Sequence, residues 1–379
     1  MIYFDQAATV LPKPAEVAQA CYDAVRWGGN GGRGGHGAAM GSLRMAYDLR
    51  CQAAELFGFS APERVCITGG ATDSLNIAIG GMFCPGDHII TTALEHNSVL
   101  RPLYRLREQG VELTILPIDK SGQVKWFELE RAVRKNTKAL VCCHGSNLTG
   151  AVQPLEELGQ LCREKGIALV VDAAQTAGLF PIHMEQMHID VLAVAGHKSL
   201  MGPQGIGLLL VSPEVDVRSF RVGGTGVQSM SETQPAEYPT HLEAGTLNGA
   251  GIAGLTAAVK LLRSQDRDEL RRREQAYARM FYDGVKDLPG VTCYGNFACE
   301  ERCPIVSLNL GDWDSAAVSD ELEQRFGIAV RPGLHCAPLV HKAFGTTEQG
   351  MVRFSFSHVN TEEEVRLGIA AVRTLALEE

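Results

Sequence analysis

Short apolar runs alternate with stretches of helical periodicity through the first two-thirds of the chain. Several runs are apolar on both faces, which is typical of strands covered by helices on both sides. The runs that predict strands are 65–68, 88–92, 111–117, 139–144, 168–172, 191–195 and 206–211. The patterns that predict helices are 73–82, 98–109, 126–135 and 155–165, the last with Gly166 as its C-cap. This β-α-β-α order predicts an α/β fold with an open, mainly parallel sheet.

Two segments interrupt this rhythm, and the pattern changes again beyond about residue 255. Residues 28–37 contain seven glycines with Arg33 and His36 among them, and residues 223–238 are polar and glycine-rich. The first segment predicts a loop, either simply flexible or packed closely on a ligand or a second subunit. A long charged helix is expected to run to about Asp287, before strand patterns at 305–310, 328–331 and 351–356. We therefore expect a large domain of residues 16–255 and a smaller α/β domain of residues 1–15 and 256–379.

The composition excludes several classes of protein. The 379 residues are 45% hydrophobic and 21% charged, as in an ordinary globular protein. With 35 basic and 44 acidic residues the net charge is −9, and without a basic block the chain is a poor partner for nucleic acid or an anionic membrane. No apolar run is long enough to span a bilayer, and the start of the chain lacks a secretory pattern. The 11 scattered cysteines indicate reduced thiols and a cytoplasmic protein.

Two residues at predicted strand ends point to one cofactor. Lys198 closely follows the strand 191–195, and Asp172 ends the strand 168–172. Pyridoxal 5'-phosphate requires a Schiff-base lysine and a carboxylate that faces its pyridinium nitrogen. Taken alone, Lys198 is most simply a surface lysine and Asp172 a helix N-cap. Together they stand at the carboxyl edge of one sheet, where such sheets bind ligands, and they support each other.

Three other positions could contact the same cofactor. Gly69-Gly70-Ala71-Thr72 follows a strand and opens a helix, whose N-terminal amides could bind a phosphate, although most such turns bind nothing. His96 could stack on a flat ring or simply be a capping or solvated residue. Asn147 could donate to a phenolate oxygen or simply occupy a turn.

An ordered set of motifs resembles one enzyme superfamily. In order, they are Asp-Gln-Ala-Ala-Thr, Gly-Gly-Ala-Thr-Asp-Ser-Leu-Asn, Glu-His-Asn-Ser, Ser-Asn-Leu-Thr-Gly, Val-Asp-Ala-Ala-Gln, Gly-His-Lys-Ser-Leu-Met-Gly-Pro-Gln-Gly-Ile-Gly and Glu-Ala-Gly-Thr-Leu-Asn. The chain resembles the class V, fold-type I enzymes that use pyridoxal phosphate. The resemblance covers nearly the whole chain and implies a mostly parallel seven-stranded sheet. The segment 331–338, Arg-Pro-Gly-Leu-His-Cys-Ala-Pro, is similar to the cysteine motif of the cysteine desulfurase and selenocysteine lyase branch, especially the group-II, SufS-like enzymes.

The resemblance implies roles for residues around the cofactor. Lys198 would form the Schiff base, Asp172 would pair with the pyridinium nitrogen, and His96 would stack on the ring and shuttle protons. Residues implied to contact the ring oxygen or the phosphate are Gln175, Asn147, Gly70, Ala71, Thr72, His197 and, from the partner subunit of a homodimer, Thr246. Residues implied to hold the substrate are Arg353, which would clamp its carboxylate, Asn147, Ala8 and Arg33. Ala195 departs from the family, whose members usually carry a phosphate-binding Ser or Thr at that position.

Cys336 is the candidate nucleophile. Arg331 and His335 lie close to it in the sequence, and positive neighbours favour a thiolate. The other ten cysteines are interpreted as inert core thiols, and no metal site is expected. These residues predict a cysteine desulfurase that converts L-cysteine to L-alanine and leaves a persulfide on Cys336 for a sulfur-acceptor protein. A selenocysteine lyase, another class V aminotransferase or a non-catalytic scaffold are the alternatives.

Overall fold

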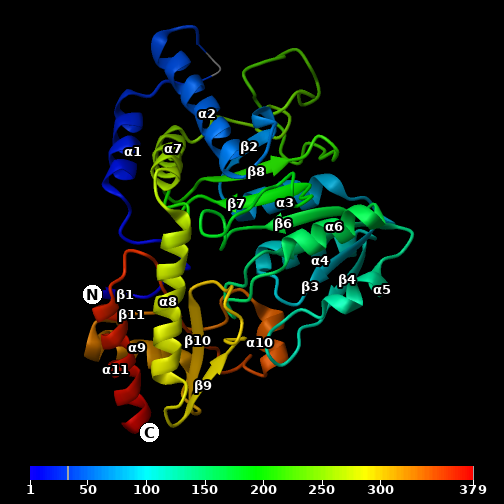
Figure 1. Ribbon diagram of the computed structural model, residues 1–379. Helices are drawn as coiled ribbons and strands as arrows, with labels where there is room; N and C mark the ends of the chain where they lie inside the picture. The colour runs from blue at the N-terminus through cyan, green and yellow to red at the C-terminus, as the bar shows by residue number, and fades with distance from the viewer. Residues whose placement is uncertain (32–33, 379) are drawn as a thin grey trace.

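A seven-stranded sheet forms the centre of the protein, whose computed structural model describes residues 1–31 and 34–378 (Figure 1). Its strands, in spatial order, are β2 (Val65–Thr68), β8 (Gly207–Val211), β7 (Val191–Ala195), β6 (Ala168–Asp172), β5 (Thr137–Cys143), β3 (His88–Thr92) and β4 (Glu112–Leu116). Strand β8 is antiparallel to both of its neighbours, and every other neighbouring pair is parallel. The expectation of an α/β fold with a mostly parallel, seven-stranded sheet is confirmed.

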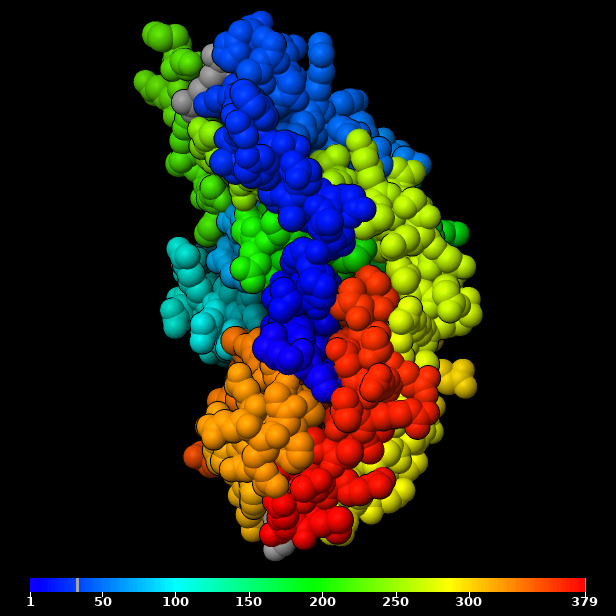
Figure 2. Space-filling view, turned by 90° about the vertical axis from the view of Figure 1, so that its left-hand side faces the viewer, coloured from blue at the N-terminus to red at the C-terminus, as the bar shows by residue number. Residues whose placement is uncertain are grey.

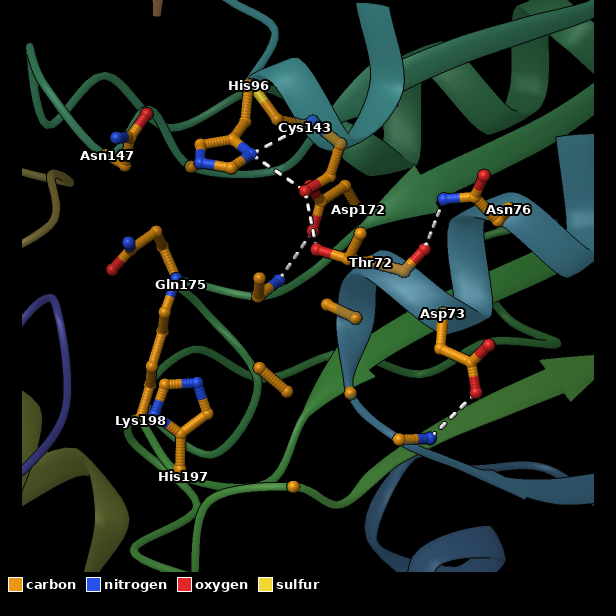
Figure 3. Close-up of a pocket in the computed structure, with 18 of the residues that line it drawn as sticks. Thr72, Asp73, Asn76, His96, Cys143, Asn147, Asp172, Gln175, His197 and Lys198 are labelled. Carbon is orange, nitrogen blue, oxygen red and sulfur yellow. Dashed lines mark hydrogen bonds between the residues drawn. The ribbon is translucent and has the colours of Figure 1, made fainter. Parts of the chain in front are cut away.

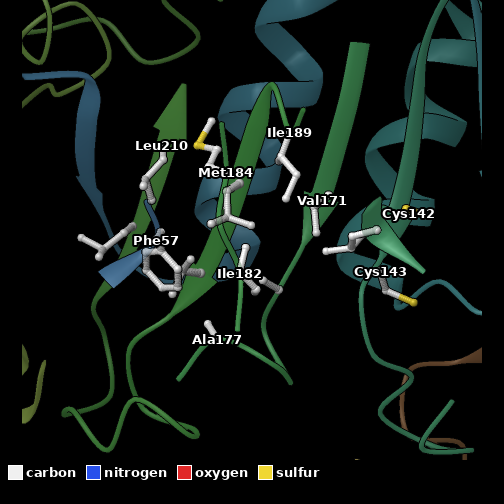
Figure 4. Close-up of a cluster of buried hydrophobic side chains, with 14 of the residues drawn as sticks. Phe57, Cys142, Cys143, Val171, Ala177, Ile182, Met184, Ile189 and Leu210 are labelled. Carbon is white, nitrogen blue, oxygen red and sulfur yellow. The ribbon is translucent and has the colours of Figure 1, made fainter. Parts of the chain in front are cut away.

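Both faces of this sheet are buried. Along β6, Leu169 and Val171 belong to one apolar cluster and Val170 to another, because successive side chains point to opposite faces. Figure 4 shows part of the first cluster, where Val171 and Leu210 face Phe57 and Ile182. The elements that connect and cover the strands are η1 (Pro62–Arg64), α3 (Ala71–Met82), α4 (Asn97–Glu108), η2 (Trp126–Glu128), α5 (Leu129–Ala132) and α6 (Leu155–Lys165). Gly166 ends α6 with φ of 65°, the left-handed cap that its position predicts.

A second layer of structure comes from the two ends of the chain. Its elements are β1 (Ile2–Tyr3), α8 (Arg267–Val285), β9 (Val291–Tyr294), β10 (Ile305–Leu310), α9 (Ser315–Phe326), β11 (Ile328–Ala329), α10 (Pro338–Phe344), β12 (Val352–Ser355) and α11 (Glu362–Glu378). Strands β12, β10 and β9 form an antiparallel sheet in that order, and β1 pairs in parallel with β11. Phe4 is fully buried here, with its ring centroid 5.0 Å from that of Phe356. Figure 2 shows the N-terminal segment, in dark blue, lying against the orange and red C-terminal part.

Three further helices pack together beside the large sheet. Helices α1 (Ala15–Trp27) and α2 (Gly37–Leu56) both lie on α7 (Gly249–Arg263) (Figure 1). His36 caps α2, since its Nδ1 accepts a hydrogen bond from Ala39 N at 3.4 Å. No helix within the described residues is long and apolar enough to cross a membrane.

Several predicted elements differ from the structure. The expected long charged helix is two helices, α7 and α8, because Asp266 accepts a hydrogen bond from Glu269 N at 3.0 Å and starts a new helix. The expected helix over 126–135 stops at Ala132, since Val133 has extended backbone angles. Strands β1 and β9 were not predicted. Both are short and lack full burial, so neither produces a continuous apolar run.

Candidate active site

A cavity of about 660 Å³ opens at the carboxyl edge of the large sheet. Cys143, Asp172 and Ala195 end β5, β6 and β7, and all three line it. Of the residues predicted to form the site, those that line the cavity are Gly70, Ala71, Thr72, His96, Asn147, Asp172, Gln175, His197 and Lys198 (Figure 3). The position agrees with the rule that open α/β sheets bind ligands beyond the carboxyl ends of their strands.

Asp172 and Lys198 place a buried carboxyl group and a buried amine in the same cavity. Asp172 Oδ1 accepts a hydrogen bond from Ala174 N at 2.9 Å. Burial raises the pKa of Asp172, while the Ala174 amide and the Lys198 charge oppose the rise. Burial likewise lowers the pKa of Lys198 to about 8, with Asp172 acting against the shift. Both groups thus lack the solvation that their charged forms need, and a polar ligand between them would supply it.

His96 presents a neutral imidazole to the cavity. It is the N-cap of α4, and its Nδ1 accepts a hydrogen bond from Ser98 N at 3.0 Å. Burial, followed by the charge of Lys198, lowers the pKa of His96 to about 4. Because Nδ1 is an acceptor, the neutral ring carries its hydrogen on Nε2. Ser98 Oγ lies 2.9 Å from His96 Nδ1 and 2.7 Å from Thr72 Oγ1, so Ser98 joins the ring to the first turn of α3.

The N-terminus of α3 has the properties of a phosphate cradle. Gly70 precedes the helix with φ of 140°, a conformation that favours glycine, and no side chain caps the helix. Gly207 on β8 packs directly behind it, where an added Cβ would lie 2.6 Å from Gly70 Cα. His197 Nδ1 is buried and has no hydrogen-bond partner among the described residues. Amides at an uncapped helix end and an orphaned imidazole nitrogen suit a phosphate group.

Arg353, expected to clamp the substrate, lies outside the lining of this cavity. It stands on β12 with 1% of its surface exposed. Its Nη2 donates to Asp5 Oδ1 at 2.6 Å and its Nη1 donates to Asn147 O at 3.0 Å. Its Nε is buried without a partner among the described residues, so the guanidinium keeps N–H donors beyond the two bonds given above.

The N-terminal segment is hydrogen-bonded to two residues of the site, Gln175 and His197. Gln175 Nε2 donates to Ala7 O at 3.1 Å, and Ala8 beside it is partly exposed. The His197 carbonyl accepts hydrogen bonds from Thr9 Oγ1 at 3.1 Å and from Lys13 Nζ. This segment therefore fixes the peptide that precedes Lys198, a role that no motif indicates.

Cys336 lies in a tight turn beside the cavity. His335 and Cys336 have φ of 50° and 55°, in the left-handed region, at a cost on the order of 1 kcal/mol or more each. The Cys336 carbonyl accepts a hydrogen bond from Asn97 N at 2.8 Å, and Asn147 Nδ2 donates to His335 O at 2.7 Å. Cys336 itself is partly exposed.

One sequence-based argument about this turn is wrong. Burial lowers the pKa of His335 to about 3, and its Nε2 lies 3.0 Å from Arg331 O. His335 is thus neutral near pH 7 and brings no positive charge to the Cys336 thiol. The interpretation of the remaining cysteines as core thiols also fails for Cys84 and Cys299, which are exposed, while Cys21, Cys51 and Cys293 are only partly buried.

Among the described residues, the predicted site residues that do not line the observed cavity are Ala8, Thr246, Cys336 and Arg353. Thr246 is exposed and absent from the cavity lining of its own chain. Arg33 lies outside the described residues. Sequence reasoning in turn missed Ser98, Glu95 and Asn97, whose contacts with the site depend on the folding of β3 and α4 against distant segments.

Comparison with known proteins places the chain in a family. The family model described as aminotransferase class V matches residues 2–367. The chain belongs to the class V aminotransferase family. A class V relative named "Probable cysteine desulfurase" from Methanothermobacter thermautotrophicus is 31% identical over 97% of this chain and 92% of its own. A Pyrococcus abyssi protein of the same name is 33% identical over 99% of this chain and 94% of its own.

A solved structure in the same family has a closely similar fold. The apo cysteine desulfurase from Thermococcus onnurineus NA1 matches with a TM-score of 0.93 and 31% identity, covering 100% of this chain and 95% of that one. Class V members of this branch are pyridoxal phosphate enzymes. The residues found here fit that cofactor, since a buried carboxyl group, a buried amine, a neutral imidazole and a phosphate cradle share one cavity.

Proposed function

We propose that this protein is a cysteine desulfurase that releases L-alanine from L-cysteine and retains the sulfur as a persulfide on Cys336. The observation that carries the proposal is the position of Cys336. Its carbonyl is bonded at 2.8 Å to Asn97 N, and Asn97 directly follows the cavity residue His96. Relatives that match nearly the whole chain are named cysteine desulfurases. An aminotransferase would have no need of a thiol at this position.

The cavity residues would hold pyridoxal phosphate by complementary groups. Asp172 would face the pyridine nitrogen, Lys198 would bind the aldehyde carbon and His96 would cover one face of the ring. Residues proposed to hold the phosphate or the ring oxygen are Gly70, Ala71, Thr72, His197, Gln175, Asn147 and, across a dimer, Thr246. When bound, the cofactor supplies an electron sink for the Cα of an attached amino acid.

Lys198 would move the proton at the substrate Cα. An amine is a base only when it is unprotonated, and burial lowers the pKa of Lys198 to about 8. A substantial fraction of the amine is therefore available near neutral pH. His96, with a neutral ring, would donate a hydrogen bond from its Nε2–H into the cavity and could accept a proton only at the expense of its bond to Ser98 N.

Cys336 would accept the sulfur. Its thiolate attacks the substrate sulfur, an S–S bond forms, the substrate Cβ–S bond breaks, and the three-carbon product takes up a proton to become alanine. The Arg353 side chain would orient the substrate carboxylate with its free Nε, aided by Asn147, Ala8 and Arg33. A second thiol, from a reductant or an acceptor protein, then removes the outer sulfur.

The remaining features of the proposal concern assembly and context. We propose a homodimer, because Thr246 is exposed on its own chain and residues 223–238 are largely exposed as well. We also propose that residues 1–15 and 256–379 act as a small domain beside the larger domain of residues 16–255. A cytoplasmic location, where thiols stay reduced, suits a persulfide carrier. Light scattering of the purified protein tests the dimer, and a monomeric mass would contradict it.

A substrate comparison tests the activity. Alanine release is measured from L-cysteine and from L-selenocysteine, with excess reductant, for the wild type and for Cys336→Ala. The proposal predicts release from L-cysteine by the wild type and loss of that activity in Cys336→Ala, which still binds the cofactor. Release from selenocysteine alone would identify a selenocysteine lyase instead, and release from neither would contradict both.

A further inference from the structure

The first turn of α4 touches both the cavity and the Cys336 turn. A helix begins with amide groups that have no partner within the helix. In α4, Asn97 N donates to the Cys336 carbonyl at 2.8 Å, and the next amide, Ser98 N, donates to His96 Nδ1 at 3.0 Å. Adjacent amides of one helix thus fix the backbone of Cys336 and the ring of His96.

A second tether holds the same turn from the cavity side. Asn147 lines the cavity, and its Nδ2 donates to the His335 carbonyl at 2.7 Å. An amide nitrogen carries two hydrogens, so Asn147 retains one donor for the cavity. Consecutive carbonyls, those of His335 and Cys336, are therefore held by two different segments, helix α4 and the turn that follows β5.

The turn requires such support. His335 and Cys336 both have positive φ, a conformation that non-glycine residues keep only where their surroundings hold it. Within the turn itself, Ala337 N donates to Leu334 O at 2.9 Å and His335 Nε2 lies 3.0 Å from Arg331 O. These local bonds shape the turn, and the bonds from Asn97 and Asn147 join its His335 and Cys336 carbonyls to segments that contribute to the cavity lining.

We propose that the Asn97 amide, together with the Asn147 side chain, is a positioning device that holds Cys336 at the distance and orientation needed for attack on sulfur in the cavity. This inference rests on the proposed role of Cys336 as nucleophile. It assigns Asn97 a task that depends on its backbone N–H alone, since its side chain has no hydrogen bond among the described residues.

Asn97 offers a sharp experiment because it is the first residue of α4. Proline is tolerated at that position, and the preceding residue, His96, already has the extended angles, φ −70° and ψ 155°, that a proline requires. Asn97→Pro therefore deletes the N–H bond to Cys336 while preserving the helix. Asn97→Ala is the matched control, because it removes the same side chain and keeps the N–H.

Two readouts compare the variants as holoenzymes. The first readout is the rate at which iodoacetamide alkylates Cys336, followed by peptide mass spectrometry. We expect this rate to be about fivefold higher in Asn97→Pro than in Asn97→Ala, which is a typical effect of one lost hydrogen bond. We expect kcat for alanine release to fall about tenfold with KM and cofactor absorbance unchanged. Equal or slower alkylation, together with equal kcat, would overturn the proposal.

Hydrogen exchange of the wild type keeps the test independent of the variant's folding and of turnover. The Asn97 amide is expected to exchange at least about tenfold more slowly than an unprotected amide. Unprotected exchange would overturn the tether. If the wild type released no alanine while Asn97 stayed protected and alkylation differed as predicted, the desulfurase proposal would fail and the tether would stand.

Discussion

Arg353 Nη2 donates to Asp5 Oδ1 at 2.6 Å, joining β12 near the end of the chain to the segment that follows β1. The guanidinium is 1% exposed, and burial lowers the pKa of Arg353 while Asp5 raises it. Asp5 is the only carboxylate bonded to this buried cation among the described residues. The pair therefore favours the charged form of the buried Arg353 guanidinium, which the proposed substrate contact would require.

Asp5→Asn should destabilise the protein and weaken substrate binding. A buried cation without its counter-charge costs roughly 3–5 kcal/mol, and the 20% exposure of the Asp5 side chain reduces this to about 2–3 kcal/mol. Urea unfolding measures the free energy, and steady-state kinetics measure KM for L-cysteine. Exposed Glu348, changed to Gln, is the control. Unchanged stability in Asp5→Asn would show that the ion pair does not hold Arg353.

Glu95→Gln should change how stability depends on pH. Burial raises the pKa of Glu95 to about 8, and its Oε2 has no hydrogen-bond partner among the described residues. The folded protein holds this proton more tightly than the unfolded chain does. The resulting contribution to the free energy of unfolding is therefore complete below the ordinary pKa of a glutamate and is lost as the pH rises through about 8. The amide keeps the oxygen that accepts from Thr92 Oγ1 at 2.6 Å and cannot ionise.

The measurement is unfolding of wild type and Glu95→Gln at pH 5.5 and 8. The stability of the variant relative to the wild type should increase by at least about 1.4 kcal/mol between these pH values, which corresponds to a shift of one pKa unit or more. Buried histidines with lowered pKa, such as His96 and His144, affect both proteins equally and cancel in the difference. A constant difference would mean that Glu95 is already ionised at pH 5.5.

Gly207→Ala should disturb the phosphate cradle. Its Cβ would lie 2.6 Å from both Gly70 Cα and Val194 O, which are backbone atoms that cannot move aside easily. We expect a loss of about 1–3 kcal/mol in stability and a cofactor dissociation constant raised about tenfold or more. Gly166→Ala is the control, since it has positive φ but open space and caps α6 far from the cavity lining. Wild-type cofactor affinity in Gly207→Ala would refute this role.

Covalent incorporation of pyridoxal phosphate into the apoprotein should follow the ionisation of Lys198. Only the unprotonated amine reacts with an aldehyde, and burial lowers the pKa of Lys198 to about 8. The rate, measured by borohydride trapping and peptide mapping, should rise about fivefold from pH 7 to pH 8, by about another twofold above pH 8, and then level off. Lys198→Ala should trap no cofactor. A rate still rising steeply at pH 10 would assign an ordinary lysine pKa to the reacting group.

The sequence predicts helices and strands best where an apolar run ends abruptly at a polar residue or a glycine. Strands β6 and β7 match their predicted ranges because fully apolar runs end at Asp172 and before Gly196. The break between α7 and α8 was missed, since charged residues continue across it and only the Asp266 cap marks it. The strand-end rule also directed attention to Lys198 and Asp172, which the structure places in one cavity.

The contacts that complete the site are not visible in the sequence. The hydrogen bonds from Asn97 to Cys336 and from Arg353 to Asp5 join residues that are far apart in the sequence. The charge state of His335 depends on burial that arises only after folding, and the local sequence suggested a positive charge beside Cys336 that the neutral ring does not supply. Short-range sequence patterns predict helices, strands and the residues at strand ends. The contacts of Asn97, Arg353 and His335 depend instead on tertiary packing.

The most direct test of the account is a single turnover followed by mass spectrometry of the intact Cys336 peptide. The reduced holoenzyme is mixed with one equivalent of L-cysteine, alkylated and digested, and alanine is measured in the same sample. The account predicts one additional sulfur on Cys336 for each alanine formed and none on the other ten cysteines. Alanine formed without sulfur on Cys336, or with sulfur on another cysteine, would contradict it.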